Sequence, residues 1–276
     1  MITLEQIPED HPARAFLTGN TTWFAVQADP RFSYGLHVPD GFTPGAAHPL
    51  IVVVHGTSRR AQELRDTWAP FAEQHQAVIV TPLFPAGITS TDDLDSYKAI
   101  EEQGVRFDQV LFDLLDEVAA RWGIEVGRFY LTGHSGGGQF TSRMLLLHPD
   151  RLAGVVISAP GRVTLIDPGQ KWPRGTADTP ARFGVDIDAA AVARVPALLT
   201  AGDADAGTAE LRAQDDASQA GYGATRVARL ATLASNLRDH GADIRLELAP
   251  GAGHHGNPTL AIAQRFLGEL IAGGVR

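Results

Sequence analysis

The sequence FYLTGHSGGG, residues 129–138, joins an apolar strand pattern to a helical pattern that continues to Leu147. A serine between two such elements must lie on a sharp, strained turn, where side chains two positions before and after it would clash. Gly133 and Gly137 meet that requirement around Ser135. The turn lifts the serine hydroxyl above the sheet, and the start of the following helix favours developing negative charge. We therefore predict a nucleophile at Ser135; the simpler alternative is a glycine-rich turn in which the serine only caps the helix.

Short β-rich runs alternate with amphipathic helical patterns along the chain, and this alternation predicts an α/β fold with a mostly parallel sheet between helices. The opening is different, because Thr22–Ala28 and Ser33–Pro39 flank a short turn and are typical of an antiparallel hairpin. Buried strands are expected at Leu50–His55, Ala77–Thr81, Arg128–Gly133, Leu152–Ser158, Ala197–Ala201 and Ile244–Leu248. Helical stripes are expected within residues 107–122, 227–237 and 260–271, the last after a cap at Asn257-Pro258.

Two stretches break this rhythm. Gly161–Arg194 is loose in pattern and contains Pro168-Gly169 and Pro173, whereas Asp205–Gly223 is polar and rich in alanine and glycine. Insertions of this length in a compact domain are usually functional lids or binding loops. We therefore expect a single domain over residues 1–276, with a lid insertion at residues 161–194.

Composition narrows the classes of function. The chain has 276 residues, of which 44% are hydrophobic, enough for one large α/β domain with a sizeable core. It contains no cysteine, which excludes disulfides, thiolate metal sites and a cysteine nucleophile. The net charge of −9 argues against nucleic acid as a partner. The first twenty residues lack the pattern of a signal peptide, and no apolar run approaches the length of a bilayer span, so we expect no membrane partner and a cytoplasmic location.

Gly133, Ser135 and Gly137 form a pattern that we call the elbow, residues 133–137. With this pattern, the chain resembles the α/β-hydrolase superfamily over nearly its whole length. It is most similar to esterases of the polyhydroxybutyrate-depolymerase and dienelactone-hydrolase types. The resemblance implies an eight-stranded sheet with its first strand antiparallel, and a triad in the order Ser, acid, His. It also implies an oxyanion hole made by the N–H groups of Gly136 and Thr57, the residue after His55-Gly56. Ser58 is an alternative donor, and an ordinary strand-end turn at Gly56 is the simpler interpretation.

The acid and the base are expected on loops that follow late strands. The run that begins at Ala197 ends with two carboxylates, Asp203 and Asp205. The family's usual spacing favours Asp205 as the acid, and Asp203 would then cap the turn. The sequence PGAGHHG, residues 250–256, offers two histidines, and the family's Gly-x-Gly-His pattern favours His254 over His255. A metal site is the weaker interpretation of this pair, because no third ligand stands at a recognisable spacing.

Four side chains are candidates for contact with substrate. They are Phe84 after a strand, Trp172 in the insertion, Arg59 directly after the oxyanion turn, and His134 at the variable position of the elbow. Together these features predict a serine hydrolase that needs no cofactor and cleaves the carboxylic ester of a soluble, small to medium substrate through an acyl-enzyme. The alternatives are an amidase, thioesterase, peptidase or acyltransferase on the same triad, or a non-catalytic ligand-binding protein with this fold. Nothing in the sequence indicates an oligomeric state.

Overall fold

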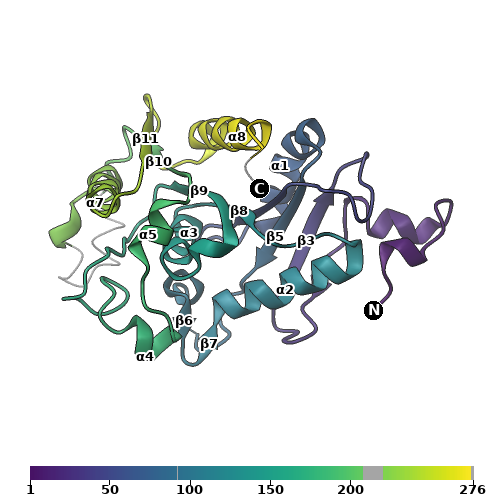
Figure 1. The fold of residues 1–276 in the computed structure, drawn as a ribbon, viewed down its shortest axis with the longest axis horizontal. Coiled ribbons are helices and arrows are strands. Elements are labelled where there is room, and N and C mark those ends of the chain that lie inside the picture. The colour runs from purple at the N-terminus through teal and green to yellow at the C-terminus, as the bar shows by residue number, and fades with distance from the viewer. Residues whose placement is uncertain (92, 208–219, 275–276) are drawn as a thin grey trace.

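The central sheet of the computed structural model, which describes residues 1–91, 93–207 and 220–274, has the strand order β1-β3-β5-β4-β8-β9-β10-β11, with β2 paired to β3 (Figure 1). Six neighbouring strands run parallel, from the middle of the sheet to the edge formed by β11. They are β4 (Leu50–Val54), β5 (Val78–Leu83), β8 (Phe129–His134), β9 (Leu152–Ser158), β10 (Ala197–Gly202) and β11 (Ile244–Ala249). The other edge is antiparallel and holds β1 (Gly19–Asn20), β2 (Phe24–Ala25) and β3 (Ser33–Val38).

Helices cover both faces of this sheet. One face carries α1 (Ala61–His75) and α8 (Asn257–Ala272), and the other carries α2 (Phe107–Trp122), α3 (Gly136–Leu147) and α7 (Arg226–Asp239) (Figure 1). Successive strand residues point to opposite faces. In β4, for example, Val52 and Val54 join the core beneath α2 and α3, while Ile51 and Val53 pack with Trp68 of α1. The core therefore has two apolar layers with the sheet between them.

Short elements connect these layers. Two 3₁₀ turns, η1 (Leu4–Gln6) and η2 (Pro12–Phe16), precede the sheet. Between β5 and α2 lie η3 (Ser96–Ala99) and a small antiparallel ribbon of β6 (Glu101–Glu102) and β7 (Val105–Arg106). The turn η4 (Pro149–Arg151) leads into β9, and η5 (Ala220–Tyr222) leads towards α7.

The predicted strands and helices are confirmed, with shifts at their ends. The first strand is antiparallel to its neighbour, as expected: β1 and β2 each pair antiparallel with β3, and β3 in turn runs antiparallel to β5. One detail needs correction, because the expected cap at Asn257 is displaced. The last helix already includes Asn257. The N-cap position is occupied by Gly256, which has no side chain to cap the helix.

The insertion at residues 161–194 contains two short helices, α4 (Thr179–Phe183) and α5 (Ala189–Ala193). Its Trp172 is buried, and the indole N–H donates to the carbonyl oxygen of Ala99. The single-domain organisation and the lid role of this segment stay predictions. Of the second predicted insertion, residues 208–219 lie outside the described part of the chain. No helix within the described ranges has both the length and the apolar character that crossing a membrane would require.

Candidate active site

Ser135 lies on the turn between β8 and α3, at the carboxyl end of the parallel strands. Its φ of 56° and ψ of −112° fall in a region that residues with a side chain rarely occupy. A Cβ on Gly133 would lie 2.4 Å from the carbonyl carbon of Gly137, and one on Gly137 would lie 2.2 Å from the carbonyl oxygen of Val54. Only glycine fits at these two positions, which confirms the steric argument drawn from the sequence.

Three side chains from separate loops form one hydrogen-bonded chain. Nε2 of His254, in the loop between β11 and α8, lies 3.1 Å from Oγ of Ser135, and its Nδ1 lies 2.8 Å from Oδ2 of Asp205, after β10. An ionised carboxylate only accepts hydrogen bonds, so Nδ1 of a neutral His254 carries the proton. Nε2 is then free to accept the proton of the serine hydroxyl, the arrangement that activates a serine nucleophile.

The Asp205 carboxylate is 1% exposed and pairs with Arg226, whose Nη1 lies 3.2 Å away and whose side chain is 2% exposed. Burial alone would raise the pKa of Asp205, but the hydrogen bond and charge of His254, together with the charge of Arg226, lower it below its usual value. The carboxylate is therefore ionised at neutral pH. Sequence reasoning missed Arg226, because it follows Asp205 by 21 residues and no motif marks it.

The neighbouring candidates for acid and base have other contacts. Oδ1 of Asp203 accepts from the backbone N–H of Gly251 at 2.7 Å, so this exposed carboxylate ties the β10 loop to the loop that carries the histidines. His255 is exposed and lies at the rim of the cavity beside the elbow. The structure thus joins Asp205 and His254, rather than Asp203 and His255, to Ser135.

The backbone N–H groups of two residues, Thr57 and Gly136, belong to the surroundings of Ser135. The nitrogen of Thr57 lies 3.3 Å from the position of a Cβ built on Gly136, so the two residues are in close contact beside Ser135. Within the described ranges, neither of their N–H groups donates to an acceptor of the protein. Unpaired donors beside a nucleophile are what an oxyanion hole requires.

His55 fixes the turn that presents Thr57. Its Nδ1 lies 2.8 Å from the carbonyl oxygen of Gly56, and its Nε2 lies 3.0 Å from the backbone nitrogen of Phe84, so Nδ1 donates and Nε2 accepts. Burial lowers the pKa of His55 to about 4, which keeps the ring neutral and suits one donor and one acceptor. The hydroxyl of Tyr97 donates to the carbonyl oxygen of His55 at 2.9 Å.

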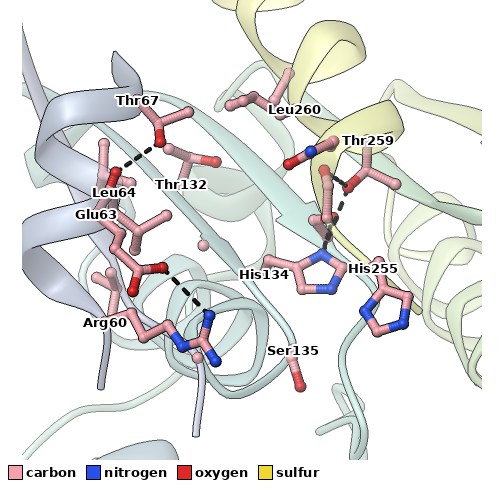
Figure 2. Close-up of a pocket in the computed structure, with 18 of the residues that line it drawn as sticks. Arg60, Glu63, Leu64, Thr67, Thr132, His134, Ser135, His255, Thr259 and Leu260 are labelled. Carbon is pink, nitrogen blue, oxygen red and sulfur yellow. Dashed lines mark hydrogen bonds and ion pairs between the residues drawn. The ribbon is translucent and has the colours of Figure 1, made fainter. Parts of the chain in front are cut away.

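A cavity of about 480 Å³ opens beside Ser135 between α1 and α8. Figure 2 shows its walls, with Leu64 and Thr67 on the α1 side and Leu260 and Thr259 on the α8 side. Arg60 and Glu63 form an exposed ion pair at its edge, with Nη1 and Oε2 3.3 Å apart. Trp68, Val53 and Ala263 add apolar surface. The cavity therefore combines apolar walls with a polar rim.

Of the four residues expected to contact substrate, only His134 lines this cavity. Phe84 is fully buried, and Trp172 is 5% exposed, so their rings serve the core. The Arg59 guanidinium donates to the carbonyl oxygens of Thr57 (2.7 Å) and Leu94 (2.9 Å) and thereby supports the turn at Gly56-Thr57. Sequence reasoning missed the α1 residues of the cavity, because their apolar stripe is the same as that of any core helix.

Among the residues that the structure describes, no group of three or more His, Asp or Glu side chains is placed to hold a metal ion.

Comparisons with known proteins give partial sequence matches and full-length structural ones. No protein-family model matches the chain. It is 28% identical over 127 residues to poly(3-hydroxyalkanoate) depolymerase C of Paucimonas lemoignei, a match that covers 45% of this chain and 30% of the depolymerase. It is 28% identical over 135 residues to poly(3-hydroxybutyrate) depolymerase of Ralstonia pickettii, covering 44% and 28%. The matches thus span less than a third of these relatives' length.

Solved structures match over nearly the whole chain. The poly(3-hydroxybutyrate) depolymerase of Bordetella parapertussis superposes with a TM-score of 0.74 at 26% identity, covering 93% of each chain. The poly(aspartic acid) hydrolase-1 of Sphingomonas sp. KT-1 gives a TM-score of 0.73 at 24% identity, covering 90% of this chain and 98% of the hydrolase.

Proposed function

Because the chain belongs to the α/β-hydrolase superfamily, we propose that it is a serine hydrolase that cleaves carboxylic esters through an acyl-enzyme. The observation that carries this proposal is the hydrogen-bonded chain from Asp205 through His254 to Ser135. The two unpaired N–H groups of Thr57 and Gly136 support it, because a binding protein without chemistry has no need of them.

The geometry fits an acyl transfer in two halves. The Ser135 hydroxyl attacks the ester carbonyl as His254 takes its proton, and the N–H groups of Thr57 and Gly136 stabilise the oxyanion, for which one such donor is typically worth ~3 kcal/mol. His254 then gives its proton to the departing alcohol, leaving the acyl group on Ser135. In the second half, His254 takes a proton from water, which attacks the acyl-enzyme, and returns that proton to Oγ of Ser135 as the acid leaves.

The substrate proposed is a soluble, small to medium ester. The cavity of about 480 Å³ lies within the range of roughly 300–1,000 Å³ that is usual for small-molecule sites. The depolymerases act, by their names, on polyesters, and their sequence matches cover less than a third of their length. Polymer hydrolysis is therefore the competing outcome of a substrate screen. A cytoplasmic location remains a prediction from composition, and cell fractionation tests it.

A fluorophosphonate probe followed by peptide mapping tests the proposal directly. We expect the wild-type protein to be labelled at Ser135, and Ser135→Ala to abolish labelling and lower kcat on an activated ester by ~10⁴-fold or more. His254→Ala should be nearly as damaging, whereas the exposed His255→Ala, as its matched control, should be much milder. Labelling at another residue in the Ser135→Ala protein would sink the assignment. Ester, amide and thioester substrates, offered to the wild type, then separate the reaction classes.

A further inference from the structure

His134 lies where three elements of the site meet. It is the residue before Ser135 in the elbow, and its ring points towards the start of α8 and the loop of His254 (Figure 2). The ring centroids of His134 and His254 are 4.9 Å apart, with 36° between their planes. His134 is therefore in direct contact with the histidine that serves Ser135.

Both ring nitrogens of His134 are engaged by the protein. Nε2 lies 2.8 Å from the carbonyl oxygen of His254, and Nδ1 lies 2.9 Å from Oγ of Ser158. A carbonyl oxygen can only accept, so Nε2 carries the proton and donates it, and Nδ1 accepts from the Ser158 hydroxyl. Burial, followed by the nearby charge of His254, lowers the pKa of His134 to about 4, so this neutral tautomer persists at neutral pH. No ring nitrogen is left for substrate.

Ser158 connects this contact to the nucleophile itself. It is the last residue of β9, and its carbonyl oxygen accepts from the backbone N–H of Ser135 at 2.9 Å. Its hydroxyl is the group that donates to His134. One buried residue therefore fixes both the backbone of the nucleophile and the ring beside it.

The loop of His254 needs such a contact because it starts far from the elbow. It follows β11, which is three strands away from β8 in the sheet, or roughly 14 Å at the usual strand spacing. Its first part is held by the loop after β10, through Ala204 N–H to the Ala252 carbonyl oxygen (3.0 Å) and through Asp203. The bond from His134 to the His254 carbonyl oxygen holds the far end of the loop against the elbow.

We propose that His134 is a positioning residue, which ties the loop of His254 to the elbow and so sets the distance between His254 Nε2 and Ser135 Oγ. This inference rests on the proposed function. It replaces the sequence-based expectation that His134 contacts substrate, since the ring acts on the base rather than on the ligand.

Three substitutions of His134 test the contributions of its ring and of its hydrogen bonds. In His134→Gln, the side-chain amide N–H can reach the position of Nε2 and keep the bond to the His254 carbonyl oxygen. His134→Asn is too short for that bond, and His134→Phe keeps the ring volume without either hydrogen bond. His148→Asn is the matched control, because His148 follows the opposite end of α3, where its Nε2 bonds to Asp108 at 2.8 Å, and Asn is again too short for that bond.

Steady-state kinetics on a p-nitrophenyl ester, with the rate of fluorophosphonate labelling, give the test. One lost hydrogen bond is worth about 1 kcal/mol, so we expect His134→Asn and His134→Phe to lower kcat and the labelling rate by about 5- to 10-fold, with KM unchanged. His134→Gln should stay within about twofold of the wild type in kcat. His148→Asn should lower the melting temperature and leave kcat unchanged.

Each other result overturns the inference. Unchanged kcat in His134→Asn would show that the bond positions nothing, even if His134→Phe failed to fold. A raised KM with unchanged kcat would make His134 a substrate contact, and a loss in His134→Gln equal to that in His134→Asn would exclude the bond as the cause. A wild-type protein that is not labelled at Ser135 would overturn the proposed function itself, which is distinguishable from all of these.

Discussion

At the scale of single residues, burial distinguishes two carboxylates that are both candidates for the acid in the sequence. Asp205 is buried against Arg226 and bonds to His254, whereas Asp203 is exposed and holds a backbone N–H. Only the first can stabilise an imidazolium that forms beside Ser135.

Replacing each acid by its amide tests this difference. Asp205→Asn should lower kcat by ~10⁴-fold, because the imidazolium loses its counter-charge and His254 its correct tautomer. It should also lower the melting temperature, because Arg226 would then face a neutral amide in a buried site. Asp203→Asn, the matched control, should be nearly neutral in kcat. If only Asp203→Asn loses activity on an activated ester, the acid has been misassigned.

The residues predicted from the sequence share one property. Ser135, Asp205 and His254 each follow a strand within a short local pattern, so spacing along the chain locates them. Arg226 and Ser158 reach the site through contacts between distant segments, and nothing in their local sequence marks them. The three residues of the hydrogen-bonded chain could therefore be predicted from the sequence, whereas the residues that hold them in place could not.

At the scale of elements, α3 is held at both ends. Its start is fixed by the glycines of the elbow, and its end is fixed by His148, whose Nε2 lies 2.8 Å from Oδ2 of Asp108 in the first turn of α2. Arg106 bonds to the same carboxyl oxygen through Nη2 at 2.6 Å, and the side chain of Asp108 is fully buried. The helix that follows Ser135 is therefore tied to α2 at its end.

This contact makes stability depend on pH in the acid range. Burial alone would raise the pKa of Asp108, but its bonds to His148 and Arg106 lower it to about 2. A lowered pKa in the folded state contributes stability that is complete above the unfolded value near 3.8 and is lost as pH falls towards 2. We expect Asp108→Asn to lower the free energy of unfolding at pH 7 by about 2 kcal/mol and to flatten its pH dependence between pH 4 and 2.

Urea unfolding at several pH values measures this dependence. Asp113→Asn is the matched control, since Asp113 is exposed on the same helix. An Asp108→Asn protein that loses stability with acid as steeply as the wild type would show that the contact does not hold α3.

At the scale of the whole molecule, the cavity depends on two helices that are far apart in the sequence. Residues of α1 near position 64 and of α8 near position 260 meet across it, on the same face of the sheet. Helical periodicity predicted that α8 has an apolar stripe, but it could not show which part of that stripe stays uncovered in the fold. For this reason the sheet and the elbow could be predicted from the sequence, whereas three of the four residues expected to contact substrate do not line the cavity.

The size of this cavity predicts how activity depends on acyl chain length. With p-nitrophenyl esters, kcat/KM should fall as the acyl chain lengthens, and no jump should occur above the solubility limit of the substrate. Leu260→Ala enlarges the cavity and should shift the preference to longer chains, by about fourfold for each methylene group that it newly buries, since one such group is worth about 0.8 kcal/mol. Phe16→Ala is the control, because Phe16 is 61% exposed and does not line the cavity. Wild-type preference for long chains, or activation on emulsified lipid, would show that the substrate binds elsewhere on the molecule.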